Sequence, residues 1–88
     1  MHEMSLMADL FRKIEAIATD ENAKRVTRVR VKLGALAHIT PDHFREHFEQ
    51  AAAGTVAEGA QLDVEALTDE SDPNAQDILL DSVDVDEA

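Results

Sequence analysis

The sequence contains no cysteine. This absence excludes disulfide bonds, thiolate zinc sites, iron–sulfur clusters and cysteine nucleophiles from these 88 residues. No apolar run approaches the roughly 18 to 20 residues that a membrane-spanning helix requires, and the opening MHEMSLMADL lacks the basic start and the cleavage site of a secretory signal. We therefore expect a cytoplasmic protein without a membrane span.

Basic residues are also scarce. Lys and Arg number 8 against 19 Asp and Glu, which gives a formal net charge of -11. Residues 68–88 carry eight of these acids and no base. Because nucleic acids and anionic membranes are bound through cationic surfaces, this charge argues against both as partners.

Signals of catalysis are missing as well. A chain of 88 residues forms one small domain with a modest core and little room for an enclosed active site. It has neither a glycine-rich phosphate loop nor a nucleophile elbow, and its serines occur in no recognisable triad context. We predict that the protein is not an enzyme.

The first half of the chain shows clear hydrophobic periodicity. Apolar side chains recur at steps of three and four between residues 4 and 19, which predicts an amphipathic helix. They are Leu6, Leu10, Ile14 and Ile17. Residues 24–34 alternate apolar and basic side chains, which is typical of a half-buried strand that ends at a glycine. The apolar members are Val29, Val31 and Leu33, and the basic members are Arg28, Arg30 and Lys32.

A second helix is predicted from Pro41 to about residue 54. Thr40 is suited to cap its N-terminus, and a proline is tolerated at the first helical position because its missing N–H has no partner there. Phe44 and Phe48 lie one turn apart and mark the buried side of this helix.

Two further strands follow. Residues 60–66 alternate apolar with acidic side chains and predict a strand, and residues 68–77 are polar and predict a loop. Residues 78–85 predict a third strand with Leu79, Val83 and Val85 on one face.

The order of these elements predicts an α+β fold of two layers. A strand, a helix and a strand in succession favour a parallel crossover, and the last two strands are expected to pair as an antiparallel hairpin, so that the three-stranded sheet is mixed. Each element has one apolar face, so both helices should pack on one side of the sheet. On the other side, Arg28, Arg30 and Lys32 are expected to lie opposite Asp63 and Glu65.

The chain start carries the clearest chemical signal. With a free amino group on Met1, a square-planar metal could take the terminal nitrogen, the His2 backbone nitrogen and the His2 ring nitrogen in fused chelate rings. Glu3 is one candidate for the fourth ligand. Such nitrogen and oxygen donors suit Ni²⁺ or Cu²⁺.

Three other histidines are weaker candidates. His43 and His47 have the spacing of a helical two-histidine metal site. Phe44 and Phe48 occupy the buried face of that helix, so two partly exposed histidines on its flank are the favoured interpretation. His38 precedes the helix in a loop that could fold back toward the chain start as an auxiliary ligand.

Three segments of the chain resemble the HypA/HybF family of hydrogenase nickel-incorporation proteins: MHEMSLMADL, AKRVTRVRVKLGALAHITPDHFREHFE and AGTVAEGAQLDVE. The resemblance covers about residues 1–67, and ILLDSVDVDE is similar to the last strand of that family. It implies a single nickel-binding domain over residues 1–88 whose ligands centre on His2 and Glu3. Such a domain passes nickel toward the large subunit of a nickel–iron hydrogenase, or toward urease, together with a GTPase partner.

The chain departs from this family in two places. The family inserts a zinc-binding domain with two Cys-x-x-Cys pairs between its last two strands, whereas this chain has only the short acidic loop 68–77, so no zinc is expected. A further ligand is sometimes an aspartate at the start of the second helix. Thr40 is nearest to that position here and Asp42 follows two residues later, so Asp42 and His38 are additional candidate nickel ligands.

Two functions from different classes therefore compete. The first is a nickel metallochaperone in the maturation of a nickel enzyme. The second is an accessory subunit that docks on a larger metalloenzyme or maturation complex without loading metal. A third interpretation, an unrelated small α/β regulator, predicts neither nickel binding nor such a complex.

Overall fold

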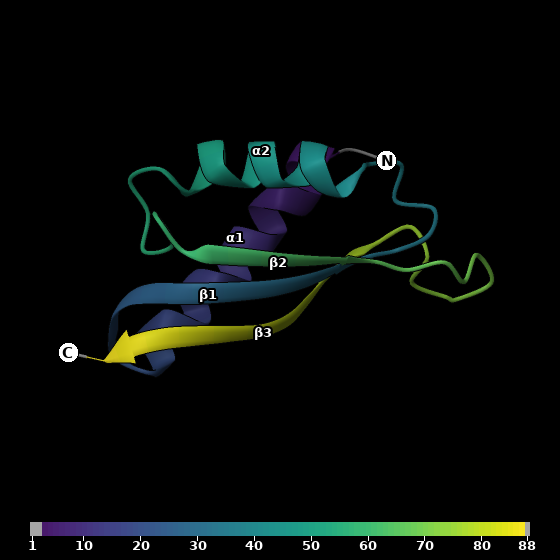
Figure 1. The fold of residues 1–88 in the computed structure, drawn as a ribbon. Coiled ribbons are helices and arrows are strands. Elements are labelled where there is room, and N and C mark those ends of the chain that lie inside the picture. The colour runs from purple at the N-terminus through teal and green to yellow at the C-terminus, as the bar shows by residue number, and fades with distance from the viewer. Residues whose placement is uncertain (1–2, 88) are drawn as a thin grey trace.

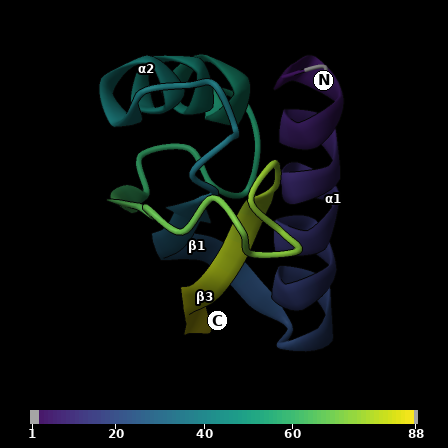
Figure 2. The same ribbon diagram turned by 90° about the vertical axis from the view of Figure 1, so that its right-hand side faces the viewer.

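The computed structural model describes residues 3–87, with the side chains of residues 5–86. Its elements are α1 (Glu3–Asp20), β1 (Ala23–Leu33), α2 (Pro41–Ala52), β2 (Gln61–Ala66) and β3 (Ile78–Glu87). The strands form one mixed sheet, and both helices cover the same face of it (Figure 1). In Figure 2, α1 runs upright along one side of the sheet, and α2 lies at the top beside the first turns of α1. The predicted two-layer α+β fold is confirmed.

β1 is the central strand of the sheet, in the order β2-β1-β3. It pairs in parallel with β2, as the crossover predicts, and antiparallel with β3. The expected hairpin between the last two strands is therefore wrong. After β2 the chain crosses the end of β1, where the Leu67 N–H donates to the Leu33 carbonyl at 2.8 Å and the Gly34 N–H donates to the Asp77 carbonyl at 2.9 Å. The 10 residues of β3 then pair along the 11-residue β1, a longer partner than the 6-residue β2.

A bulge in β3 changes which of its side chains face the helices. Arg30 pairs with Ser82 and Val31 pairs with Leu80, which leaves Asp81 as an extra residue. An extra residue moves the side chains on its two sides to opposite parities. Leu80 consequently packs against the core, and Leu79 lies half-buried outside it, so the prediction for Leu79 is wrong. Val83 and Val85 pack against the core as expected.

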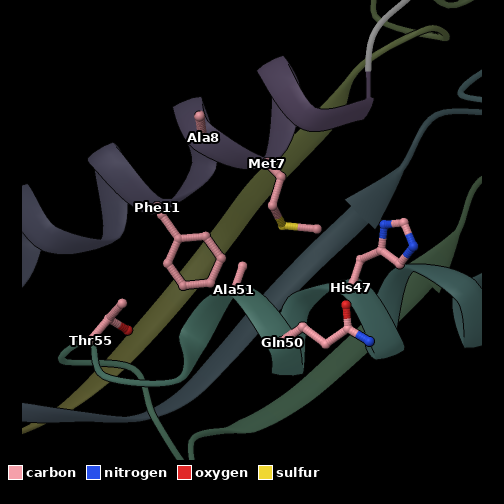
Figure 3. Close-up of a pocket in the computed structure, with 7 residues that line it drawn as sticks. All are labelled: Met7, Ala8, Phe11, His47, Gln50, Ala51 and Thr55. Atoms are coloured by element: carbon pink, nitrogen blue, oxygen red, sulfur yellow. The ribbon is translucent and has the colours of Figure 1, made fainter.

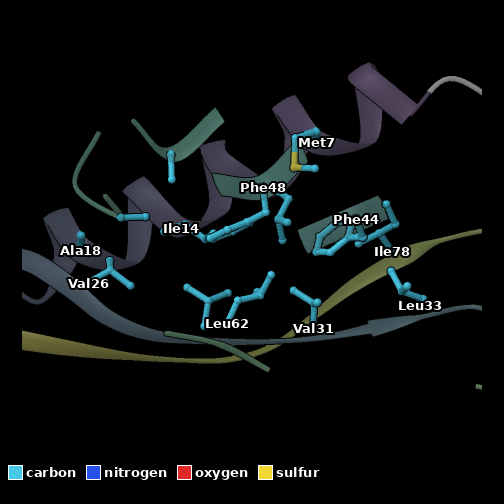
Figure 4. Packing of buried hydrophobic residues seen from close by; sticks show 14 residues of the cluster. Met7, Ile14, Ala18, Val26, Val31, Leu33, Phe44, Phe48, Leu62 and Ile78 are labelled. Atoms are coloured by element: carbon cyan, nitrogen blue, oxygen red, sulfur yellow. The ribbon is translucent and has the colours of Figure 1, made fainter. Parts of the chain in front are cut away.

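The hydrophobic core lies between the helices and the sheet (Figure 4). Ile14 of α1 and Phe44 and Phe48 of α2 are at most 1% exposed. Phe11 of α1 stacks on Phe48 with 5.0 Å between ring centroids, so the two helices also contact each other. Each fully buried side chain of this size contributes about 1.5–3 kcal/mol. No helix in the described residues combines the length and the hydropathy that crossing a membrane demands.

The outer face of the sheet carries ion pairs between β1 and its two neighbours. The pairs are Arg28 with Asp63 at 2.9 Å, Arg30 with Asp84 at 3.3 Å and with Asp63 at 3.8 Å, and Lys32 with Asp81 at 3.8 Å. The contact of Arg28 Nε with Asp63 is an ion pair but not a hydrogen bond, because the N–H of Nε does not point at the carboxylate. The basic stripe therefore has the structural role that its alternation predicted, with β3 as well as β2 supplying the acids.

The loop of residues 68–77 packs against the segment that follows β1. The Leu36 N–H donates to the Ala75 carbonyl at 2.7 Å, and Ala75 is 4% exposed. At the tip, Asp69 Oδ1 accepts hydrogen bonds from the Ser71 N–H at 3.0 Å and from the Ser71 hydroxyl at 2.7 Å. These contacts give the loop a defined path from one edge of the sheet to the other.

Candidate metal centre

The chain-start ligands fall at the limit of the described structure. Met1, His2 and the side chain of Glu3 lie outside the described residues. The backbone of Glu3 opens α1, whose first turns are held by Met7, which is 7% exposed, and Leu10, which is 3% exposed. The predicted chelate at the amino terminus therefore stays a prediction, attached to a helix that the core fixes in place.

The two additional candidate nickel ligands, His38 and Asp42, lie on the surface. His38 is exposed and has a left-handed backbone, with φ of 61°, in the segment before the helix. Thr40 caps the helix, because its hydroxyl oxygen accepts the His43 N–H at 3.2 Å. Asp42 is exposed in the first turn. No three His, Cys, Asp or Glu side chains gather into a metal site within the described part of the chain.

The structure brings together the two histidines that the sequence placed on a helix flank. His43 Nε2 and His47 Nε2 lie 3.0 Å apart, and the ring centroids are 4.3 Å apart with 62° between the ring planes. His43 is exposed and His47 is half-buried. The helical spacing was visible in the sequence, but the direct contact between the rings depends on side-chain conformations that no sequence pattern fixes.

A pocket of about 550 Å³ opens between α1 and α2, and His47 is one of the residues that line it (Figure 3). Its lining is largely apolar and consists of Met7, Ala8, Phe11, His47, Gln50, Ala51 and Thr55. Sequence reasoning missed this pocket. The available signal was the width of the apolar stripe of α1, in which Met7 and Phe11 lie to one side of the sheet-facing residues.

Comparisons with known proteins agree with the fold and the sequence pattern. Residues 1–71 match the family described as hydrogenase/urease nickel incorporation, metallochaperone, hypA. Hydrogenase maturation factor HypA from Desulfitobacterium hafniense is 45% identical over 67 residues, which cover 76% of this chain and 59% of that protein. The HypA protein of Chlorobium limicola is also 45% identical over 67 residues, covering 76% of this chain and 58% of that protein.

Solved structures share the fold. The solution structure of the Ni metallochaperone HypA from Helicobacter pylori superposes with a TM-score of 0.80 and 20% identity, covering 100% of both chains. A second solution structure of a HypA protein gives 0.72 and 22% identity, covering 97% of this chain and 96% of that one. The matched segment spans less than two thirds of the curated relatives, about 59% of the first. Because the family match extends over residues 1–71 of 88, this chain belongs to the HypA family of hydrogenase and urease nickel-incorporation proteins.

Proposed function

We propose that this chain is a nickel metallochaperone that binds Ni²⁺ at its amino terminus and delivers it during maturation of a nickel enzyme. The observation that carries the proposal is the start Met1-His2-Glu3, which lies within the segment that matches a nickel-incorporation family. A relative with the same fold is itself named a Ni metallochaperone. The ion is the cargo of the protein.

The chain start has the donors that nickel prefers. The terminal amine of Met1, the backbone nitrogen of His2 and its imidazole form two fused chelate rings, and Glu3 supplies a carboxylate for the fourth position. α1 begins at Glu3, and the first N–H groups of a helix have no acceptor within it. Coordination of a metal ion through the backbone nitrogen of His2 would therefore break no hydrogen bond of the helix. His38 and Asp42 are the residues of α2 and its approach that we propose as additional donors.

The sequence has no recognisable catalytic motif, which favours a carrier over an enzyme. We propose that the loop 68–77 occupies the position at which the family inserts its zinc-binding domain, so that this single domain binds nickel without a zinc module. The recipients would be the large subunit of a nickel enzyme and a GTPase maturation partner. The protein would act in the cytoplasm, where such enzymes are assembled.

Isothermal titration with Ni²⁺ tests the site, provided that Met1 is the authentic first residue. We expect one bound ion per chain at this site and loss of that binding in His2→Ala. A residue added before Met1 should weaken binding because it removes the amine ligand, whereas the same residue added after Ala88 should not. Affinity should also fall below about pH 7, because protons compete for an ordinary imidazole near 6.5 and an ordinary α-amino group near 7.7–8.0.

The competing function makes the opposite prediction. A docking subunit would form a stable complex with a nickel-enzyme large subunit or with the GTPase partner, and His2→Ala would not weaken it. Failure of the wild-type chain to bind Ni²⁺ at its amino terminus, together with an unchanged complex in His2→Ala, would replace the carrier by the docking subunit.

A further inference from the structure

We propose that the pocket between α1 and α2 is a docking site for a basic amphipathic helix of a partner protein (Figure 3). The apolar side chains of that helix enter the pocket, and its Lys or Arg side chains lie over the rim. This inference goes beyond the proposed carrier function, because it needs no metal ion and uses residues other than the candidate nickel ligands.

The described residues leave an apolar pocket open between the two helices. Its volume of about 550 Å³ lies within the range of about 300–1,000 Å³ that is typical of binding pockets. Phe11 stacks on Phe48 but stays half-buried, and Ala8 and Ala51 beside it are exposed. Met7 adds a flexible thioether, which adapts to apolar groups of different shapes. Apolar side chains of a partner would remove this surface from water, which stabilises the complex.

The polar groups of the pocket are few, and most of them are engaged. The Thr55 hydroxyl donates to the Ala52 carbonyl at 2.7 Å and accepts the Ala57 N–H at 3.1 Å. His47 is in contact with a second imidazole of α2. Among the described lining residues, this leaves the exposed amide of Gln50. A free small ligand is usually oriented by several polar groups that converge on it, so the lining favours apolar side chains that a larger scaffold holds in place.

A helix suits these walls better than an extended segment does. Both walls are helices, whose backbone N–H and C=O groups bond along the helix itself and offer no edge to a strand. An extended segment would bury backbone polar groups without partners, which is costly, whereas a helix satisfies its own. Helices also pack by fitting side-chain ridges into the grooves of their neighbours. The occupant is therefore helical.

The helical layer carries an excess of acids. α1 and α2 together contain seven acids and three bases. All three bases are engaged within the protein: Arg12 and Lys13 pair with Asp9 at 2.8 and 3.2 Å, and Arg45 donates to the Leu62 carbonyl at 2.7 Å. The charge that a partner meets on this layer is therefore negative.

Two exposed acids lie next to the pocket. Glu15 follows Phe11 by four residues on α1, and Glu46 precedes Gln50 by four residues on α2, so each is one turn from a lining residue. Neither glutamate forms an ion pair with another described residue. Lys or Arg of a docked helix would pair with them, and complementary charge speeds encounter and fixes orientation. The same acids argue against a second copy of this chain as the occupant, because both copies would bring negative charge to the contact.

Binding of a capped helical peptide, with EDTA present to remove metal, tests the site. The peptide has about 18 residues of Ala, Gln and Lys, which is long enough to form a helix, with Leu and Phe one turn apart as its large side chains. Two-dimensional amide NMR should show shifts centred on the lining residues of α1 and α2, and isothermal titration measures the affinity. Replacing the Lys residues of the peptide by Glu, or its Leu and Phe by Ala, should abolish binding.

Variants of the protein separate the apolar and the charged contacts. Ala51→Gln puts a longer neutral side chain at an exposed lining position and should weaken binding at least about tenfold, because it blocks the centre of the contact. Glu15→Gln with Glu46→Gln should weaken it about 2- to 30-fold, because each exposed ion pair changes an equilibrium constant by about 1.4- to 5-fold. Glu65→Gln with Glu70→Gln is the matched control, since it removes the same charge from exposed positions outside the helices and should leave the affinity unchanged.

The amide spectrum without peptide shows that each variant is folded. The proposal is overturned if wild-type protein does not bind the Lys peptide, if the shifts centre outside the lining residues, or if the Glu peptide binds as tightly. It is also overturned if Ala51→Gln leaves the affinity unchanged, or if the control pair weakens binding as much as the test pair. A dimer of the metal-free chain that Ala51→Gln dissociates in sedimentation would place a second copy in the pocket and would likewise refute the proposal. None of these outcomes depends on whether the protein binds nickel.

Discussion

Gly34 should be intolerant of any side chain, because the loop 68–77 passes directly over it. A Cβ atom placed on Gly34 would lie 2.2 Å from the carbonyl oxygen of Ala75 and 2.5 Å from its carbonyl carbon. Both neighbours are backbone atoms, so the collision cannot be relieved by turning a side chain. In Gly34→Ala the loop must move away from the end of β1 by about 1 Å, since real Cβ contacts are essentially never shorter than 3.0 Å.

The cost follows from the contacts that hold the loop there. Gly34 N–H donates to the Asp77 carbonyl at 2.9 Å, and Leu36 N–H donates to the Ala75 carbonyl at 2.7 Å. Two hydrogen bonds at about 0.5–1.5 kcal/mol each, with about 0.8 kcal/mol for the methyl group of Ala75, total roughly 2–4 kcal/mol. Alanine also restricts the unfolded chain, which returns about 0.4–1 kcal/mol. The net loss is roughly 1–3.5 kcal/mol, or a fall of roughly 4–28 °C in melting temperature for a domain of this size.

Thermal unfolding and amide hydrogen exchange together test this reasoning. The amide of Leu36 should lose its protection in Gly34→Ala. Gly54→Ala is the control, because nothing lies within 4 Å of the position that its methyl group would take and its cost arises from φ of 81° alone, so Leu36 should stay protected. A melting temperature within about 3 °C of wild type, with the Leu36 amide still protected, would refute the close approach of the loop.

Two further predictions concern the core and the loop tip. Phe48→Ala should lower the free energy of unfolding by about 3–5 kcal/mol in chemical denaturation, because it leaves a cavity beside Phe11, whereas the exposed Gln50→Ala should change it little. The Ser71 hydroxyl and backbone N–H lower the pKa of Asp69, so Ser71→Ala should raise this pKa toward its ordinary value in a carboxyl NMR titration. A lowered pKa stabilises the fold above the unfolded-state value, so this contribution is present at neutral pH and is lost as pH falls through the folded-state pKa. An unchanged Asp69 pKa in Ser71→Ala would contradict the assignment.

The sequence predicted the elements closely because their periods are local properties. The helix expected between residues 4 and 19 spans Glu3–Asp20, and the strand expected over residues 24–34 spans Ala23–Leu33. The start of α2 was correct to the residue, since Thr40 and Pro41 are an N-cap and a first helical position with specific chemistry. Parallel pairing of β1 with β2 also followed, because a single helix joins them.

The wrong predictions concern two features, the faces of the β3 side chains and the strand with which β3 pairs. The first depends on a single inserted residue, and the second depends on contacts between segments that are distant in the sequence. The extra residue Asp81 reversed the parity of Leu79 and Leu80, and no alternation within 78–85 marks a bulge. The partner of β3 was set by the path of the loop over Gly34, which is a tertiary contact. For the site, the donors at the chain start stay a prediction from their chemistry, because they lie outside the described residues, and the contact of His43 with His47 required a structure.

Charged side chains are arranged differently on the two layers of the molecule. On the outer face of the sheet, acids of the edge strands pair with bases of β1, including Arg25 with Asp86 at 3.3 Å. These half-exposed pairs contribute at most about 1 kcal/mol each, but they leave no continuous cationic stripe among the described residues of this face for a nucleic acid to bind. The imidazole pair lies on the helical layer, where acids of α2 stand exposed beside it. The two layers therefore differ in charge, because acids and bases neutralise one another on the outer face of the sheet, whereas the exposed acids of α2 contribute to the formal net charge of -11.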